Sequence, residues 1–308
     1  MSGVLIGFGV VGFIIVLGYV AGRFAILGAG AQPVLSKLAF NFGTPALMFS
    51  LLAKSDILDV FTPGLLVVVI SSLSCAFFFG TCAVIWRWGL PRGVIGALGS
   101  SYVNAGNLGI PIAAYVLGTI TPIAPVMLFQ LIVLAPVALS ILDVATGSTT
   151  SFWRRLSKPL TNPITLASMA GLGVGLSGTA LPEVVIQPFT LLGQATVPVM
   201  LLAFGMSLHG SIRGGERADT APVALAVVLK SLVQPAIALA ISLTLGLSGL
   251  TLMAAVLCSS FPTAQNVFIY ASRYEGASGL AHRVVLLTTV ASIPMLLLLT
   301  WVIPAVWP

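Results

Sequence analysis

Residues 101–118 read SYVNAGNLGIPIAAYVLG, and they lie within an apolar segment long enough to cross a bilayer. Pro111 has no backbone N–H, so the carbonyl of Asn107, four residues earlier, loses its α-helical partner. Gly106 and Gly109 weaken the same turn. At membrane depth, broken helices occur only where protein or a water-filled cavity surrounds them. We therefore predict a helix that breaks at Pro111 and helps to build a site.

A second interrupted segment, CSSFPTAQNVFIY at 258–270, lies in the other half of the chain. There Pro262 frees the carbonyl of Cys258, and Gln265 and Asn266 follow. Two interrupted spans in corresponding positions of two halves indicate the substrate site of a secondary transporter.

The composition places the chain among membrane proteins with several spans. It is 58% hydrophobic and 6% charged, whereas a soluble domain carries roughly 25% charged residues. The net charge of +6 comes from basic residues scattered between apolar segments, which argues against nucleic-acid binding. The three cysteines, Cys75, Cys82 and Cys258, all fall within predicted spans and suggest neither a disulfide framework nor a metal site. We expect no metal and no cofactor, with a coupling Na⁺ or H⁺ left open.

Ten membrane spans are predicted from the apolar segments. Eleven of the thirteen Lys and Arg residues fall in odd-numbered connections or at their edges, and the positive-inside rule places these connections in the cytoplasm. Both termini are then outside the cytoplasmic membrane. The predicted spans are 4–22, 34–53, 63–86, 93–118, 121–145, 163–179, 186–208, 221–247, 250–272 and 284–304.

The longest polar stretch divides the chain into two halves. We assign 1–146 to a first five-span repeat, 147–162 to a short cytoplasmic linker and 163–308 to a second repeat. An odd number of spans in each half gives the halves opposite orientations, the arrangement of inverted repeats. The second span, NFGTPALMFSLLA, and the seventh, GQATVPVMLLAFG, share an amide, then Thr, then Pro. Gly43 and Gly193 in these spans are expected to allow close helix packing.

Amide side chains are the main candidates for binding a substrate. Asn104 and Asn107 lie on one helical face, and Gln265 and Asn266 occupy the equivalent place in the other broken span. Amides can hold a carboxylate, and they can also replace lost backbone partners; the two roles are compatible. The free N–H groups at the start of each second half-helix also favour an anion. The predicted substrate site comprises Asn104, Asn107, Gly109, Pro111, Pro262, Thr263, Gln265, Asn266, Asn41 and Gln194.

Lys230 is the one basic residue deep within a predicted span. An intramembrane charge is costly and marks function by default. Gln234, one turn away, or a carbonyl at a nearby break could be its partner. Lys230 either offsets the charge of a substrate or coupling ion, or extends to the cytoplasmic surface as an anchor. Gln130 and Ser71 are further candidates for a cation site, and Gln130 could instead bond to another helix.

The sequence offers no support for an enzyme. We find no nucleophile–base arrangement and no phosphate-binding loop. No Asp or Glu lies at mid-span, so proton exchange through a pair of carboxylates is not expected.

Six blocks of sequence follow in order at 41–55, 101–118, 162–176, 191–208, 229–235 and 261–274. Together they resemble the auxin efflux carrier superfamily, which contains plant PIN-type carriers and bacterial malonate-transporter-like proteins. The resemblance covers almost the whole chain. The polar segment between the two halves of this chain is under twenty residues long, whereas the long-type plant carriers have a large loop there. This favours a bacterial-type member of the family. The blocks are NFGTPALMFSLLAKS at 41–55, SYVNAGNLGIPIAAYVLG at 101–118, NPITLASMAGLGVGL at 162–176, LLGQATVPVMLLAFGMSL at 191–208, LKSLVQP at 229–235 and FPTAQNVFIYASRY at 261–274.

The resemblance implies a fold and a function. It implies ten helices in two inverted five-helix repeats with crossing broken helices four and nine, as in bile-acid symporters and the antiporter NhaA. It also implies a scaffold of spans one, two, six and seven, and a transport domain of spans three to five and eight to ten. Small organic carboxylate anions would be carried by an elevator-type mechanism, and the scaffold would form a homodimer. A sodium-coupled bile-acid-type symporter, a channel and a non-transporting sensor are the alternatives.

Overall fold

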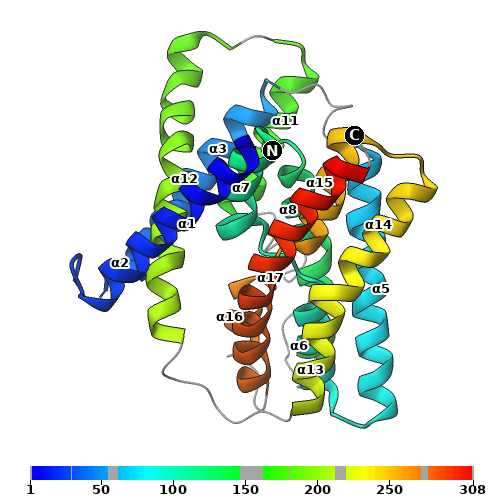
Figure 1. The fold of residues 1–308 in the computed structure, drawn as a ribbon. Coiled ribbons are helices and arrows are strands. Elements are labelled where there is room, and N and C mark those ends of the chain that lie inside the picture. The colour runs from blue at the N-terminus through cyan, green and yellow to red at the C-terminus, as the bar shows by residue number, and fades with distance from the viewer. Residues whose placement is uncertain are drawn as a thin grey trace. The chain divides into compact units, whose positions relative to one another are not determined.

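The computed structural model of this chain describes residues 2–28, 30–54, 62–145, 162–179, 181–211, 220–271 and 277–306. Within these ranges the regular secondary structure is helical, and one isolated antiparallel bridge is the only strand-like pairing (Figure 1). The predicted all-α fold class is therefore confirmed for the described residues. The predicted linker at 147–162 lies outside them, apart from Asn162.

Six helices in the described part of the chain are long and apolar enough to cross a membrane. Shorter apolar helices, Gly9–Arg23, Ala105–Leu117, Pro163–Leu176 and Gly249–Ser260, occupy the other predicted spans. An arrangement of ten spans in inverted repeats stays a prediction. The six long helices are Ala31–Leu52, Pro63–Ile85, Ile123–Leu142, Glu183–Leu208, Thr220–Thr244 and Ser278–Ile303.

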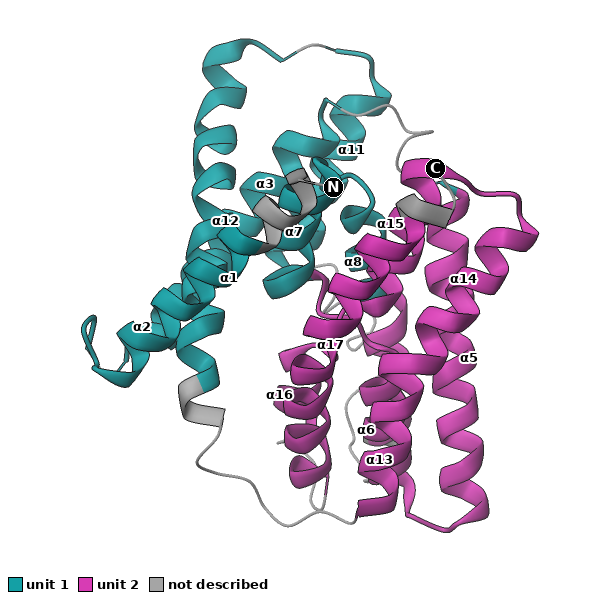
Figure 2. Ribbon diagram, viewed as in Figure 1, with its two compact units in different colours: residues 1–62, 106–132, 156–213 teal, residues 63–105, 133–155, 214–308 magenta. Residues whose placement is uncertain are grey.

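The chain forms two compact units, each assembled from three stretches of sequence (Figure 2). Unit 1 comprises 1–62, 106–132 and 156–213, and unit 2 comprises 63–105, 133–155 and 214–308. In the labels below, η marks a π-helical segment; η2 (Ala105–Gly109) and η4 (Gln130–Leu134) cross from one unit to the other. The helices of unit 1 are α1 (Ser2–Arg23), α2 (Ala31–Leu38), η1 (Ala39–Gly43), α3 (Thr44–Leu52), α7 (Ile110–Ile112), η3 (Ala113–Leu117), α8 (Ile123–Phe129), α11 (Pro163–Leu176) and α12 (Glu183–Ser211). Those of unit 2 are α5 (Pro63–Ile85), α6 (Leu90–Ser101), α9 (Ala135–Ala145), α13 (Thr220–Val228), η6 (Leu229–Val233), α14 (Gln234–Thr244), α15 (Gly249–Ser260), α16 (Gln265–Ala271) and α17 (Ser278–Val306).

Glycines allow helix backbones to meet in unit 1. A Cβ on Gly205 of α12 would overlap the carbonyl oxygen of Ile15 in α1, and one on Gly22 of α1 would lie 3.0 Å from the Cα of Met206. The predicted close approach at Gly43 and Gly193 is confirmed. A Cβ on Gly43 would overlap the Thr196 hydroxyl, and one on Gly193 would lie 3.0 Å from a Cα in α3. Small residues at such contacts are the usual means of packing helices in a membrane.

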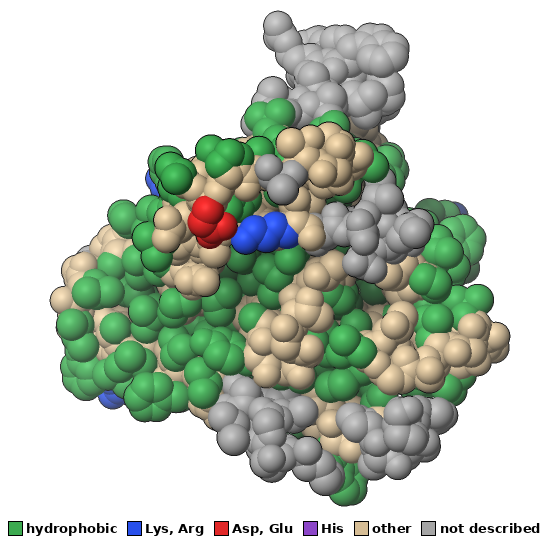
Figure 3. Space-filling model, turned by 90° about the horizontal axis from the view of Figure 1, so that it is seen from above, with side chains coloured by type: hydrophobic (Ala, Val, Ile, Leu, Met, Phe, Trp, Pro, Cys, Tyr) green, Lys and Arg blue, Asp and Glu red, His purple; other side chains and the backbone are tan. Residues whose placement is uncertain are grey.

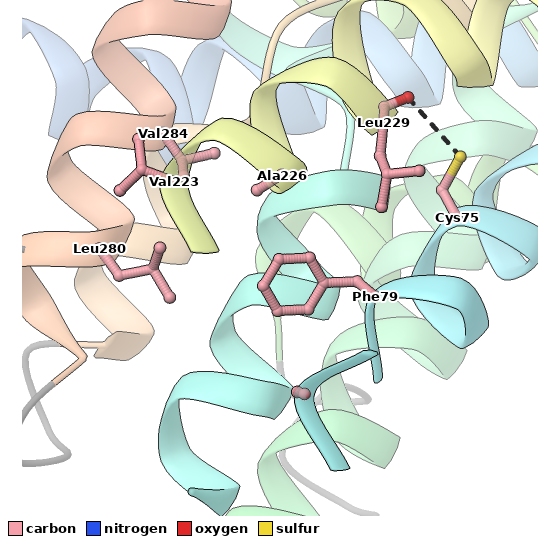
Figure 4. Packing of buried hydrophobic residues seen from close by; sticks show 8 residues of the cluster. Cys75, Phe79, Val223, Ala226, Leu229, Leu280 and Val284 are labelled. Atoms are coloured by element: carbon pink, nitrogen blue, oxygen red, sulfur yellow. Dashed lines mark hydrogen bonds between the residues drawn. The ribbon is translucent and has the colours of Figure 1, made fainter. Parts of the chain in front are cut away.

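The core of unit 2 is built from α5, α6, α13 and α17. Phe79 of α5 is fully buried and fills the space that Gly96 of α6 leaves open. Figure 4 shows it beside Ala226 and Leu229, with Leu280 and Val284 of α17 completing the cluster. The thiol of Cys75 donates a weak hydrogen bond of 3.7 Å to the Leu229 carbonyl, drawn as a dashed line in the figure.

Large apolar side chains also cover the outer surface. Phe77 and Val84 of α5 are 77% and 79% exposed, which would be costly in water and is normal against lipid. On the face drawn in Figure 3, hydrophobic side chains lie among polar side chains and backbone, and few charged side chains are seen. This surface fits a protein that is solvated by a bilayer.

Both broken spans are interrupted, but one of them not where we predicted. α15 ends at Ser260 and α16 begins at Gln265, so the break at Pro262 is confirmed. α6 ends at Ser101, residues 102–104 are non-helical, and η2 begins at Ala105. Pro111 lies inside α7, so the prediction of a break there is wrong. The turn before Pro111 widens to π geometry, which lets the helix pass the proline without a break.

Candidate functional site

The two interruptions lie against each other and are hydrogen-bonded within unit 2, at a junction that is called the crossing below. Val103 and Thr263 form an antiparallel bridge. The Asn104 N–H donates to the Pro262 carbonyl at 2.8 Å, and the Ala264 N–H donates to the Tyr102 carbonyl at 3.1 Å. Each break therefore supplies hydrogen-bond partners for backbone groups that lost theirs when the other helix ended. Hydrocarbon could not satisfy these N–H and carbonyl groups.

Thr263 joins three helices at this crossing. Its side chain is fully buried, and its hydroxyl donates to the Gly99 carbonyl near the end of α6. Its N–H donates to the hydroxyl of Thr288 in α17 at 3.1 Å, and Thr288 in turn donates to the Val284 carbonyl at 2.7 Å. Both donors of Thr263 are engaged within the protein, so this predicted site residue holds the crossing together.

An amide and two tyrosines lie together beside the crossing. Tyr102 is buried, and its ring meets that of Tyr270 edge-on at 6.3 Å between centroids. The Tyr102 side chain is hydrogen-bonded to Tyr270 and to Asn266. Asn266 and Tyr270 are four residues apart, so they share one face of α16. Asn104 is also buried, and the neighbouring Gln265 is partly exposed at the start of α16.

Lys230 lies fully buried in η6, in the same unit. Its ammonium donates to Gln234 Oε1 at 2.6 Å and to the Ser259 carbonyl at 3.4 Å. Gln234 Nε2 then donates to the Ser72 hydroxyl of α5 at 2.9 Å. The predicted partners, Gln234 and a carbonyl near a break, are both confirmed. A positive charge thus sits at the C-terminal end of α15, where the helix dipole is negative.

Ser71 connects the lysine network to the crossing helix. Its hydroxyl lies 3.3 Å from the hydroxyl of Ser259, the residue whose carbonyl accepts from Lys230. Ser71, Ser72 and Cys75 follow one face of α5, and all three contact η6, α14 or α15. Among the residues that the structure describes, no cluster of His, Cys, Asp and Glu could hold a metal ion.

Comparison with known proteins now decides the family. The family model described as "Membrane transport protein" matches residues 10–300. The chain belongs to this membrane transport protein family.

Two relatives of this membrane transport protein support the assignment. An "Uncharacterized transporter" of Methanothermobacter thermautotrophicus is 24% identical over 290 residues, which cover 91% of this chain and 92% of the relative. A "Putative malonate transporter" of Rhizobium meliloti is 24% identical over 292 residues, which cover 91% of this chain and 89% of the relative. The resemblance to the auxin efflux carriers is confirmed by this family. The chain is a multi-pass membrane transporter, and its family and relatives are transporters rather than enzymes.

The predicted site residues of this membrane transport protein divide between the two units. Asn104, Pro262, Thr263, Gln265 and Asn266 come together in unit 2, as do Lys230 and Ser71. The others lie in unit 1 and are Asn41, Asn107, Gly109, Pro111, Gln130 and Gln194.

Three of the amides in unit 1 differ in their surroundings. Asn41 is exposed, and its Nδ2 donates to the Lys37 carbonyl at 2.9 Å. Gln194 is also exposed. Gln130 is 3% exposed, and its Oε1 has no hydrogen-bond partner in the structure.

Three residues of this transport protein that lie at the crossing were not predicted from the sequence: Tyr102, Tyr270 and Thr288. The spacing of Asn266 and Tyr270 on one helix face was a signal that could have drawn attention to Tyr270. Tyr102 immediately follows the end of α6, but its position next to α16 depends on a pairing across about 160 residues. Thr288 carried no signal, because a threonine within an apolar helix usually bonds to its own backbone.

Proposed function

We propose that this protein is a secondary carrier of small organic carboxylate anions, with the substrate bound beside the crossing in unit 2. The observation that carries the proposal is the buried Lys230, held by Ser259 only three residues before Pro262. Glu183 is the one acidic residue whose side chain is described, and it belongs to unit 1. Within the described part of unit 2, the charge of Lys230 is therefore not balanced by a carboxylate, and an anion is favoured.

The polar groups beside the crossing suit a carboxylate. Asn104 and Asn266 carry amides whose N–H groups can donate to carboxylate oxygens. Asn266 is already bonded to Tyr102, so its amide orientation is constrained before a ligand arrives. A donor that is oriented in advance costs less to engage, which raises affinity. Asn107, Asn41 and Gln194, which belong to unit 1, stay predicted substrate contacts on the basis of the sequence alone.

The proposed architecture is ten spans in two inverted repeats with an elevator-type mechanism. The division of the chain supports it. Spans one, two, six and seven, the proposed scaffold, lie within unit 1. Spans three, eight, nine and ten of the proposed transport domain lie within unit 2, and spans four and five are shared between the units.

The proposed setting is the cytoplasmic membrane, with both termini outside and with a homodimer formed through the scaffold. The distribution of basic residues supports the orientation. The name of the Rhizobium relative supports small dicarboxylates as the first substrates to test. Na⁺ and H⁺ are the coupling ions to test, with Lys230, Gln130 and Ser71 as the proposed residues of a charge-coupling site.

Ligand-induced thermal stabilisation of the purified protein tests the proposal. Malonate, malate and indole-3-acetate would each be added with and without sodium, since a ligand that binds the folded state raises the melting temperature. We expect one carboxylate to stabilise the protein at millimolar concentration. Asn266→Ala should abolish the shift. Asn162→Ala, which removes an amide that caps α11 through a 2.9 Å bond to the Ile164 N–H, should retain it.

Other outcomes would overturn the proposal. Stabilisation by sodium alone or by a bile salt would favour a sodium-coupled symporter. In proteoliposomes, currents that do not saturate with substrate would indicate a channel, and binding without flux would indicate a sensor. A shift that survives in Asn266→Ala would move the substrate away from the crossing.

A further inference from the structure

Four π-helical turns in the described part of the chain end two residues before a proline. In each case the proline is the second residue of the α-helical segment that follows the turn. The fifth described π turn, η3, is followed by Gly118 and has no proline at this position. The four pairs are η1 with Pro45, η2 with Pro111, η4 with Pro136 and η6 with Pro235.

The chemistry of proline explains this spacing. In an α-helix, proline lacks the N–H that would bond four residues back, and its ring clashes with that carbonyl. A π turn closes with a bond between residues five apart, and the residue just before the proline is the donor. Thr44 N–H donates to the Ala39 carbonyl before Pro45, and Gln234 N–H donates to the Leu229 carbonyl before Pro235. The wide turn thus accommodates one extra residue at the place where proline cannot donate the α-helical hydrogen bond.

Each of these four turns also carries an amide or an ammonium side chain. The turns hold Asn41, Asn107, Gln130 and Lys230, in that order. η3, the π turn that lacks the proline, reads AAYVL and holds neither kind of group. These side chains are rare in an apolar chain of this kind, and π turns occur often at functional sites.

We infer that Pro45, Pro111, Pro136 and Pro235 are positioning residues, each of which pins a π turn and so sets the direction of its polar side chain. A π turn can migrate along a helix when every residue can form the α-helical bond. A proline prevents migration past itself. Because one residue in a helix corresponds to about 100° of rotation, migration by one position would turn the polar side chain to another face of the helix.

The contacts of η6 show what the pinning maintains. Lys230 reaches Gln234 at 2.6 Å and the Ser259 carbonyl at 3.4 Å only in the present rotation. The Leu229 carbonyl accepts from both Gln234 N–H and the Cys75 thiol. A shift of the turn would leave a fully buried ammonium without acceptors, and an uncompensated buried charge is strongly destabilising. This inference concerns the position of Lys230 and does not depend on the proposed substrate.

A double-mutant cycle on thermal stability tests the inference. We expect Pro235→Ala to lower the melting temperature of the wild-type protein by about 6–12 °C, the shift of an uncompensated buried charge in a protein of this size. In a Lys230→Met background, Pro235→Ala should cost less than half as much, because methionine needs no polar partner. The matched control is Pro294→Ala, in a plain α-helical part of α17 in the same unit. Its effect should be equal in both backgrounds.

The cycle has two decisive outcomes. Coupling between Pro235 and Lys230, with none between Pro294 and Lys230, would support the inference. Equal losses for Pro235→Ala in both backgrounds would overturn it, because proline would then contribute only packing and chain stiffness. The measurement needs no ligand, so a failure of the proposed carboxylate function would not be mistaken for a failure of this inference.

Discussion

Replacing Gly205 by alanine should separate two helices of unit 1. A Cβ at this position would overlap the Ile15 carbonyl oxygen, and it would lie 2.9 Å from the backbone N of Tyr19 and 3.0 Å from the Cα of Gly18. All three neighbours are backbone atoms of α1, so no side chain can rotate to make room. Overpacking of this kind costs about 1–3 kcal/mol or more.

Gly12→Ala in α1 is the matched control, because a Cβ there would meet nothing within 4 Å. Both substitutions gain the helix propensity of alanine, about 0.8–1 kcal/mol, so the difference between them isolates the packing cost. We expect Gly205→Ala to melt about 3–10 °C below Gly12→Ala.

Thermal unfolding of the detergent-solubilised variants, followed by intrinsic fluorescence, measures this difference. Wild-type melting temperature and yield of folded protein would be recorded alongside. Equal melting temperatures for the two alanine variants would refute the close contact of α1 and α12 at Gly205.

Three further predictions concern unit 2. Gln234→Leu should destabilise the protein by about 3–5 kcal/mol in chemical unfolding, whereas Lys230→Met combined with it should recover most of that loss. Tyr102→Phe should keep the ring contact but lower carboxylate affinity about fivefold in titration calorimetry. This loss of affinity should vanish in an Asn266→Ala background. An undiminished loss there would contradict an action of Tyr102 through Asn266. Thr263→Val should lower the free energy of unfolding by about 1–2 kcal/mol. An unchanged free energy of unfolding would contradict the role of the Thr263 hydroxyl in holding the crossing together.

The positions of the helices could be predicted because hydrophobicity is a local property. The long runs of apolar residues placed every described helix close to its predicted range. The break at Pro262 could be predicted for the same reason, since the missing N–H is a property of one residue. Lys230 and Gln234 could be paired because they are four residues apart on one helix.

The rest depended on contacts between distant residues. Pro111 was predicted to break its helix, but the chain has two ways to pass a proline, and sequence does not separate a π turn from a break. The true interruption at Tyr102 contains no proline. It is extended because its backbone pairs with Pro262 and Ala264, about 160 residues away. A local sequence pattern does not reveal a partner so far away in the chain.

The hydrogen bonds of Thr263 also limit how this part of the protein can move. They connect the end of α6, the break after α15 and the middle of α17, and they are buried inside the unit. Sliding any one of these helices along its neighbours would leave several buried donors without acceptors at once. Whatever motion accompanies transport, these three helices should travel as a single rigid block. Spin labels placed on α6 and α17 would then keep a constant separation through the cycle.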